Sequence, residues 1–149
     1  MKIYLAGPCS AEHRTLLTNI AKGLRSHQIE VYAPFELQIP NAWDMSQEEW
    51  AEKVFNADVD AIDNADAMVV ISIGRESTAG TNWEQGYAYA NAKRVYVYQI
   101  TEQPTSLMTY WGCTGFRNID LHKEDIVKDI YCDINKYGTL QNKCMTVLT

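Results

Sequence analysis

The sequence predicts an α/β fold built on a parallel sheet of about five strands with helices on its faces. Apolar runs typical of buried strands occupy residues 2–6, 29–33, 67–73 and 94–100. Stretches in which apolar residues recur at helical spacing separate these runs, which implies right-handed crossovers between parallel strands. Ligands bind such sheets outside the carboxyl ends of the strands, so we expect a site among the loops that follow them.

Helical spacing of apolar residues predicts four helices, which lie after the capping residue Ser10 and over residues 46–64, 80–93 and 123–137. Ser46 and Glu49 form a capping box at the start of the second helix. Gly138 is placed to end the last helix. Residues 116–120 favour a short fifth strand, whereas residues 139–149 show no clear period.

The length, composition and charge of the chain are typical of one globular domain, which we expect to span residues 1–149. The chain has 46% hydrophobic and 21% charged residues and a net charge of −6. This negative charge disfavours a nucleic acid polymer as partner, because such binding needs clustered Lys and Arg. No apolar run reaches the length of a membrane span or a signal peptide, so we expect a cytoplasmic protein without a membrane partner.

The cysteines and histidines show no metal-binding pattern. The four cysteines lack the paired spacing of zinc sites, and the three histidines are scattered. The dinucleotide fingerprint G-x-G-x-x-G does not follow the first strand. We therefore expect neither a metal nor an organic cofactor, although fold analogy leaves a flavin open as an alternative.

Asp58 lies on the apolar stripe of the second predicted helix. It comes four residues after Val54 and four before Ile62, and Trp50 and Phe55 belong to the same stripe. An acid on an inward face is either held by hydrogen bonds or takes part in chemistry. The sequence leaves both interpretations open.

Glu84 lies in the segment GTNWEQGYAYANAK at residues 80–93, after an apolar strand and the loop GREST. The prediction places Glu84 in the first turn of a helix, where free amides and the helix dipole favour its charged form. A charged carboxylate at the mouth of a sheet is a candidate nucleophile or base. Alternatively, Thr81 and Glu84 are only a capping box, and Gly80 only allows close packing.

Four segments together resemble the nucleoside 2-deoxyribosyltransferase family. They are the opening KIYLAGP, Asp58 eight residues before Asp66 and its apolar strand, G-T-x-x-E-x-G-Y-A at 80–88, and S-L-M-x-Y-W-G at 106–112. They follow the family's order along most of the chain. The resemblance implies a flavodoxin-like or Rossmann-like three-layer sandwich that acts on the N-glycosidic bond of a nucleoside or nucleotide.

The resemblance also implies roles for single residues. Glu84 would be the nucleophile on the sugar, and Asp58 the acid or hydrogen-bond partner of the departing base. Tyr4 and Gly7 would line the pocket, with Gly80 and Thr81 in the block around Glu84. The segment with Leu107 and Met108 would reach a neighbouring subunit's site, which implies a homo-oligomer with shared sites. The trapped sugar would pass to water or to a free nucleobase.

Two positions depart from the pattern of nucleoside-using members, which carry Asp six residues before the Glu and Asn before Leu-Met. This chain has Thr78 and Ser106 there, and the branch that hydrolyses nucleoside 5′-monophosphates carries Ser at both places. A carboxylate would repel a phosphate, whereas hydroxyls and helix-start amides can hold one. Thr78 and Ser106, together with Ser10 and Ser77, therefore favour a 5′-monophosphate. Alternatively, Ser77 and Thr78 are ordinary polar loop residues.

A non-catalytic nucleotide-binding or signalling module on the same fold is the competing hypothesis. A response regulator needs an acidic cluster after the first strand, where this chain has Gly7-Pro8-Cys9. Turnover of a nucleoside or nucleotide distinguishes an enzyme from such a module.

Overall fold

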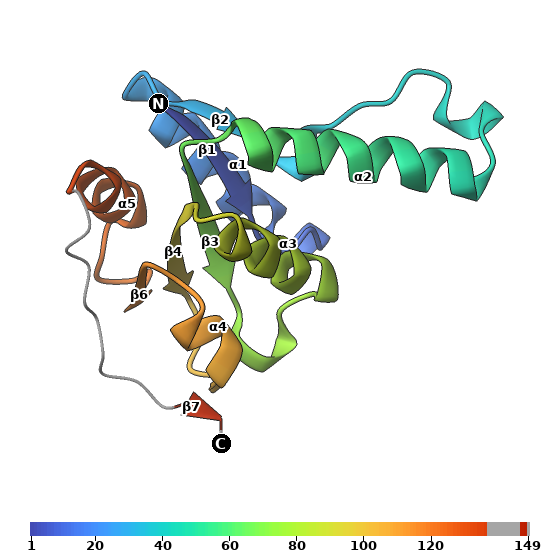
Figure 1. Ribbon diagram of the computed structural model, residues 1–149. Coiled ribbons are helices and arrows are strands. Elements are labelled where there is room, and N and C mark those ends of the chain that lie inside the picture. The colour runs from blue at the N-terminus through green and yellow to red at the C-terminus, as the bar shows by residue number, and fades with distance from the viewer. Residues whose placement is uncertain (137–146, 149) are drawn as a thin grey trace.

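The computed structural model describes residues 1–136 and 147–148 and has an α/β architecture (Figure 1). Five parallel strands form the main sheet in the order β2-β1-β3-β4-β6. These strands are β1 (Lys2–Ala6), β2 (Glu30–Tyr32), β3 (Ala67–Ser72), β4 (Arg94–Gln99) and β6 (Gly115–Asn118). The order is that of flavodoxin-like sheets and confirms the predicted α/β sandwich with about five strands.

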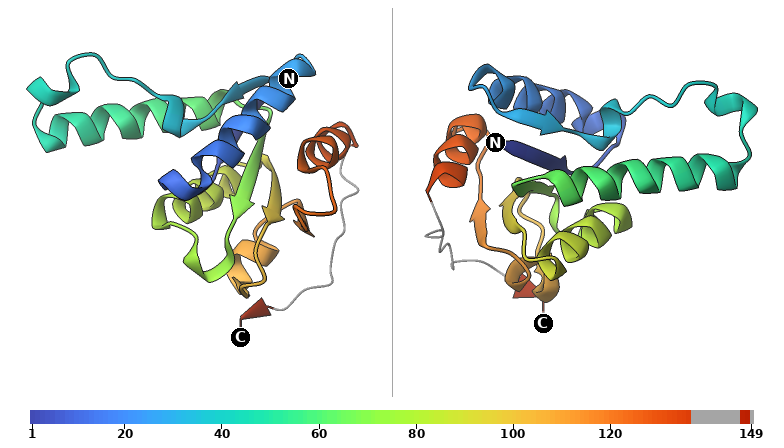
Figure 2. Two further views of the ribbon diagram at one scale, coloured as in Figure 1. Left: turned by 180° about the vertical axis from the view of Figure 1, so that it is seen from behind. Right: turned by 45° about the horizontal axis from the view of Figure 1, so that its top comes forward.

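Helices cover both faces of the sheet, as Figure 2 shows. They are α1 (Ala11–Ser26), α2 (Gln47–Asn64), α3 (Ala79–Ala90), α4 (Leu107–Trp111) and α5 (Ile126–Asn135). Helix α1 packs against α5 on one face, and α2 packs against α3 on the other. Side chains of β1 alternate between the two resulting cores: Leu5 joins the core under α1 and α5, and Tyr4 joins the core under α2 and α3.

Short elements complete the described chain. Three 3₁₀ turns are η1 (Pro34–Glu36), η2 (Ala42–Asp44) and η3 (Gly74–Glu76), and β5 (Thr105–Ser106) pairs in parallel with β7 (Val147–Leu148). Helix α5 starts later than predicted because Asp125 caps it, accepting a hydrogen bond from the Lys128 amide at 3.2 Å. Gly138, the predicted end of that helix, lies outside the described residues. None of the described helices has the length and apolar character that a membrane crossing needs.

The N-terminal part of α2 and the segment before it extend beyond the sheet as an arm (Figures 1 and 2). The prediction that the whole apolar stripe of α2 faces the core is therefore wrong: Ile62 is buried, but Trp50 is 48% and Phe55 52% exposed. The reason is length. An 18-residue helix spans about 27 Å, whereas strands of five or six residues span about 17–20 Å.

Candidate active site

A cavity of about 330 Å³ lies between α2 and α3. Helix α3 follows the loop after β3, next to β1, where the order of the strands reverses and ligands bind in such sheets. The residues that line the cavity are Val54, Phe55, Asp58, Val59, Ile62, Gly80, Trp83 and Glu84. The structure therefore brings the two predicted acids, Asp58 and Glu84, to one cavity with largely apolar walls.

Glu84 lies in the second turn of α3, not in the first. The helix begins at Ala79, and Thr78 is its N-cap, whose side chain accepts a hydrogen bond from the Thr81 amide at 3.3 Å. The capping box predicted between Thr81 and Glu84 is therefore wrong, because Thr81 is already inside the helix. Glu84 is free of a capping role.

The pKa of the Glu84 carboxyl is raised from 4.5 to about 7. Burial against the apolar wall is the largest cause, the hydroxyl of Tyr4 lowers the value, and the negative charge of Asp58 raises it again. The expectation that the helix dipole keeps Glu84 charged is thus overturned. The dipole acts within the first turn, and Glu84 stands beyond it.

Asp58 faces the cavity from α2 and is half-buried, which agrees with its predicted place on the apolar stripe. Its Oδ1 accepts a hydrogen bond of 2.8 Å from the hydroxyl of Tyr32 at the end of β2. Burial raises the pKa of Asp58, and this hydrogen bond opposes the rise. The acid is therefore both held by a hydrogen bond and exposed to the cavity.

Tyr4 stands under the two acids with its side chain fully buried. Its hydroxyl has no partner of ordinary hydrogen-bond geometry among the described residues, although it lies close enough to Glu84 to lower the pKa of that carboxyl. Burial and the charges of Glu84 and Asp58 raise the pKa of Tyr4 far above its usual value. Tyr4 is thus a neutral donor beside Glu84, although it is not among the residues that line the cavity.

Gly7, Thr78 and Thr81 join the loop after β1 to the start of α3. The Thr81 hydroxyl donates to the Gly7 carbonyl at 3.2 Å, and the hydroxyls of Thr78 and Thr81 lie 2.8 Å apart. Because the one hydrogen of Thr81 goes to Gly7, the hydrogen of Thr78 serves the contact between the two hydroxyls. A Cβ on Gly7 would stand 3.0 Å from Leu17 Cδ2 and 3.3 Å from Ile71 Cβ, so a larger residue there would require these side chains to shift.

Ser77 and Ser10 take local roles in the structure. The Ser77 hydroxyl accepts from the Ile73 amide at 3.0 Å and lies 3.3 Å from the Ser72 hydroxyl, so it braces the loop after β3. Ser10 occupies the N-cap position of α1, but its side chain makes no capping hydrogen bond. It lies 3.1 Å from His13 Nδ1 on the exposed surface.

Ser106 and Met108 are not brought to Glu84 within one chain. Ser106 caps α4, accepting from the Thr109 amide at 3.1 Å, and Met108 is 83% exposed. They line a separate cavity of about 440 Å³ between α3 and α4, which shares no residue with the cavity at Glu84. Gln85 anchors α4 there, donating 2.9 Å hydrogen bonds to the carbonyls of Thr109 and Gly112.

Sequence reasoning missed two aromatic residues near the acids, Trp83 at the cavity and Tyr32 beside Asp58. Trp83 lines the cavity and forms an edge-to-face pair with Phe55 at a centroid distance of 5.3 Å. Tyr32 bonds to Asp58. The position of Trp83 next to Glu84 was an available signal, whereas the contact of Tyr32 spans 26 residues and depends on strand order.

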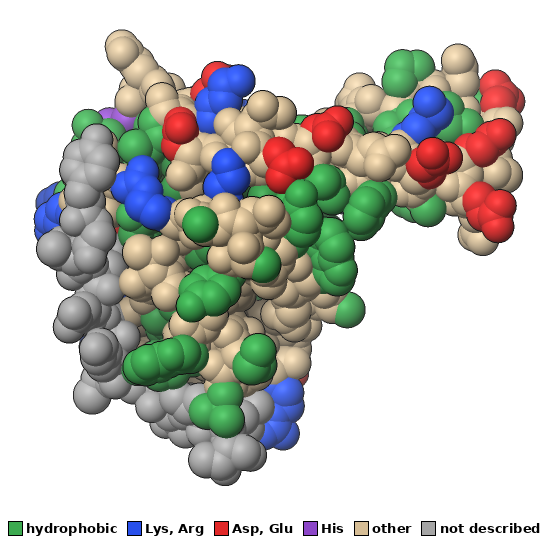
Figure 3. Space-filling model, in the orientation of Figure 1, with side chains coloured by type: hydrophobic (Ala, Val, Ile, Leu, Met, Phe, Trp, Pro, Cys, Tyr) green, Lys and Arg blue, Asp and Glu red, His purple; other side chains and the backbone are tan. Residues whose placement is uncertain are grey.

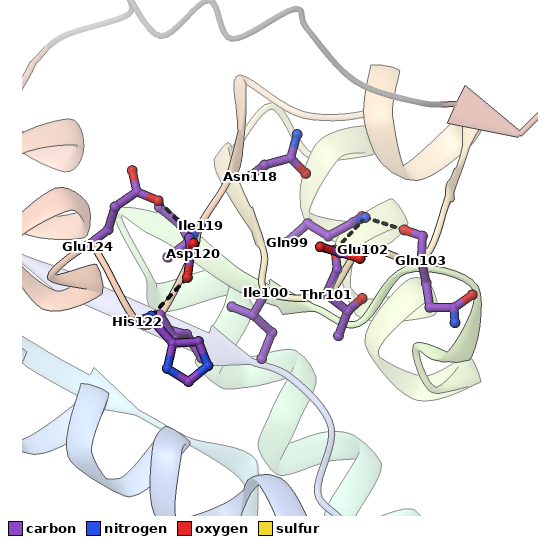
Figure 4. A pocket seen from close by; sticks show the side chains of 11 residues that line it. Gln99, Ile100, Thr101, Glu102, Gln103, Asn118, Ile119, Asp120, His122 and Glu124 are labelled. Carbon is purple, nitrogen blue, oxygen red and sulfur yellow. Dashed lines mark hydrogen bonds between the residues drawn. The ribbon is translucent and has the colours of Figure 1, made fainter.

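Another cavity, about 700 Å³, lies away from these acids at the carboxyl ends of β4 and β6 (Figure 4). Its polar groups mainly brace their own loops: Glu124 accepts from the Asp120 amide at 2.7 Å, and Asp120 accepts from the His122 amide at 3.0 Å. Gln99 donates to the carbonyls of Thr101 and Gln103. Across residues 1–136 and 147–148, no group of His, Cys, Asp and Glu is arranged to hold a metal.

Comparison with known proteins supports the fold. A 2-deoxyribosyltransferase from Bacillus psychrosaccharolyticus is 28% identical, with a TM-score of 0.72 over 86% of this chain and 95% of its own. A CMP N-glycosidase of Clostridium botulinum shares the fold at 16% identity, with a TM-score of 0.62 over 89% of this chain and 99% of its own. No curated protein matches the sequence significantly.

The family model for nucleoside 2-deoxyribosyltransferases matches residues 3–138. This range includes Tyr4, Asp58, Glu84 and the segment around Ser106, so the match covers the motifs on which the resemblance depended apart from Lys2 at the start of KIYLAGP. The chain therefore belongs to the nucleoside 2-deoxyribosyltransferase family, whose enzymes act on N-glycosidic bonds.

Proposed function

We propose that this chain cleaves the N-glycosidic bond of 2′-deoxynucleosides or their 5′-monophosphates through a covalent glycosyl–Glu84 intermediate. The observation that carries the proposal is the pair Asp58 and Glu84, which face one largely apolar cavity from two helices. Most enzymes that cleave glycosidic bonds use two carboxyl groups, one on either side of the scissile bond.

In the first step, Glu84 in its ionised form attacks the anomeric carbon of the sugar. The C–N bond breaks, its electron pair goes to the base nitrogen, and Asp58 donates a proton or a hydrogen bond to the base. In the second step, water or another base attacks the same carbon, the C–O bond to Glu84 breaks, and the deprotonated Asp58 accepts the proton that the attacking group loses. Water gives hydrolysis, and a base gives transfer.

The raised pKa of Glu84, about 7, suits the attack in the first step. At neutral pH a substantial fraction of Glu84 is ionised and can attack the sugar. A carboxylate of higher pKa is also a stronger nucleophile than an ordinary carboxylate. Burial at the apolar wall strengthens the attraction between the ionised Glu84 and the positive charge that develops on the sugar. The rate at low substrate should therefore rise as the pH increases through about 7.

The aromatic wall of the cavity supports a planar base as the leaving group. Phe55 and Trp83 are about half exposed, and their rings form an edge-to-face pair. Aromatic rings so arranged can stack on a base at a gain of about 1–3 kcal/mol. Asp58 lies on the same wall, within reach of a polar edge of such a base.

We favour the 5′-monophosphate as substrate because the N-cap of α3 is the uncharged Thr78. Thr78 stands where nucleoside-using members carry Asp. Its hydroxyl hydrogen is engaged with Thr81, so we assign the phosphate contact to the amides of Ala79 and Gly80 at the start of α3. Thr78 then contributes by being uncharged and by capping the helix.

We also propose that the enzyme is a homo-oligomer in which Ser106 and Met108 complete a neighbour's site. Hydrophobic side chains gather on the face that carries α3 and α4 (Figure 3). On α4, Leu107 is 53%, Met108 83% and Trp111 72% exposed. Aromatic residues and Met are enriched at protein interfaces, and closed symmetry is the default for such assemblies.

The test is incubation of the purified protein with deoxynucleosides and with their 5′-monophosphates, each with and without a free acceptor base, followed by chromatography. Release of free base from a monophosphate without acceptor supports the hydrolase. A new nucleoside formed only with the acceptor supports the transferase. Binding without turnover of any substrate would contradict the proposal and favour a non-catalytic nucleotide-binding module.

A further inference from the structure

Tyr32 is held from two sides next to Asp58. It is the register partner of Tyr4 across β1 and β2, and the two rings stack with centroids 5.4 Å apart and planes 22° apart. Its hydroxyl donates to Asp58 Oδ1 at 2.8 Å. The ring is fixed by Tyr4 and the hydroxyl by Asp58, so Tyr32 forms a rigid link between the sheet and α2.

We propose that Tyr32 is a positioning residue that fixes the Asp58 carboxyl so that Oδ2 faces the departing base; this inference rests on the function proposed above. The terminal torsion of an aspartate is broad, so an unbound carboxyl samples many orientations. A hydrogen bond to Oδ1 removes that freedom. It leaves Oδ2 as the oxygen that serves the base.

The consequence for the reaction concerns one proton. When the C–N bond breaks, its electron pair passes to the base nitrogen, and the proton on Oδ2 of neutral Asp58 moves to the base. Oδ1, which already accepts from Tyr32, then shares the negative charge of the product carboxylate. A hydrogen bond to a charged group is stronger than one to a neutral group, so the Tyr32 contact strengthens as Asp58 gives up its proton.

The described titratable groups that interact electrostatically with Asp58 come from four parts of the chain: Tyr32 of β2, Tyr4 of β1, Glu84 of α3, and Cys9 in the loop after β1. Burial raises the pKa of Asp58, and the hydrogen bond from Tyr32 lowers it. Without that hydrogen bond, the increase in the pKa of Asp58 that burial causes is not offset. The pKa of Asp58 then rises further.

The experiment compares Tyr32→Phe with wild type, using whichever deoxynucleoside or 5′-monophosphate the wild type cleaves fastest. Phenylalanine keeps the ring and its stacking on Tyr4. Since a positioned acid contributes about 10²–10⁴-fold to rate, we expect kcat to fall about tenfold or more while KM changes little. The limb of the pH profile that Asp58 governs should move to higher pH, as should the carboxyl ¹³C titration of Asp58.

Tyr87→Phe is the matched control. The Tyr87 hydroxyl donates to Asp63 Oδ1, also at 2.8 Å and also on α2, but outside the cavity. This variant loses the same type of hydrogen bond and should keep the wild-type kcat and pH profile. In an Asp58→Asn background, Tyr32→Phe should cause no further loss of kcat, because its effect passes through Asp58.

The outcomes separate the two proposals. An active wild type whose kcat, pH limb and Asp58 titration are unchanged in Tyr32→Phe overturns the positioning role alone. An additional loss of kcat in the Asp58→Asn background overturns it too, since Tyr32 would then act independently. A wild type that cleaves no substrate overturns the proposed function, and the role of Tyr32 falls with it.

Discussion

Tyr4 and Tyr32 stand opposite each other on neighbouring parallel strands, with stacked rings, and each hydroxyl lies by a different carboxyl group. Tyr32 donates to Asp58 on α2, and Tyr4 lies close to Glu84 on α3. Tyr4 and Tyr32, which pair across two strands, therefore each lie beside one of two acids that belong to two different helices. Because Asp58 also raises the pKa of Glu84, the four residues form one electrostatic unit.

Replacing Glu84 should abolish turnover and leave the fold intact. Glu84 does not cap α3, a role that belongs to Thr78, so Glu84→Ala loses no capping hydrogen bond. Loss of the nucleophile should lower kcat by orders of magnitude. The measurements are kcat, the melting temperature, and mass spectrometry of a glycosyl adduct on wild type. Glu76→Ala in the loop after β3 is the control, and near wild-type turnover by Glu84→Ala would refute the mechanism.

The raised pKa of Glu84 predicts a pH-dependent cost to stability. The folded chain holds this proton more tightly than the unfolded chain, whose pKa is near 4.5. The stability contribution is therefore fully present below pH 4.5 and is lost as the pH rises through about 7. Relative to Glu84→Gln, which never ionises, wild type should lose about 1–3 kcal/mol of unfolding free energy between about pH 5 and pH 8. Urea unfolding measures this, and parallel pH curves for the two proteins would contradict it.

Replacing Asp58 by Asn should slow base departure more than it weakens binding. Asparagine keeps the shape and the capacity to accept from Tyr32, but it cannot donate an acidic proton. We expect kcat to fall about 10²-fold or more with a small change in KM. A substrate whose leaving group departs without a proton should be affected much less. A variant that loses only thermal stability and keeps its kcat would assign Asp58 a structural role.

The exposed α4 predicts an oligomer with shared sites. Light scattering should give a mass above that of one chain, and Met108→Glu should weaken assembly and activity together. Leu121→Glu, which changes a 40% exposed side chain at the cavity of Figure 4, is the control and should alter neither. Mixing inactive Glu84→Ala with inactive Ser106 or Met108 variants should restore part of the activity. A monomer that stays fully active at high dilution would rule this out.

Thr78→Asp should reverse the preference for a phosphate. Aspartate is a good N-cap, so α3 keeps its start, and the change in rate reports on the added charge. Each charge-assisted hydrogen bond to phosphate is worth about 1.5–3 kcal/mol, so wild type should favour the 5′-monophosphate about tenfold or more in kcat/KM. The substitution should bring this ratio below one. A wild-type ratio already below one, and unchanged in the variant, would make the enzyme an ordinary nucleoside deoxyribosyltransferase.

The sequence by itself determined the sheet, the two main faces and the place of Asp58. Apolar runs and helical spacing are local patterns, and they fix which side of a strand or helix is buried. Asp58, four residues from both Val54 and Ile62, had to share their face, and all three line the cavity. The four segments that resemble the family follow the family's order along the chain. This resemblance then identified Glu84 as the candidate nucleophile.

Only the tertiary structure decided where α3 begins and what surrounds the two acids. Thr78 and Thr81 are both hydroxyl residues able to cap, so local sequence does not choose between them. In the structure Thr78 caps α3, Thr81 binds the Gly7 carbonyl across 74 residues, and Glu84 lies in the second turn, where burial raises its pKa. The link from Tyr32 to Asp58 likewise requires β2 beside β1 under α2, and no local pattern encodes that packing.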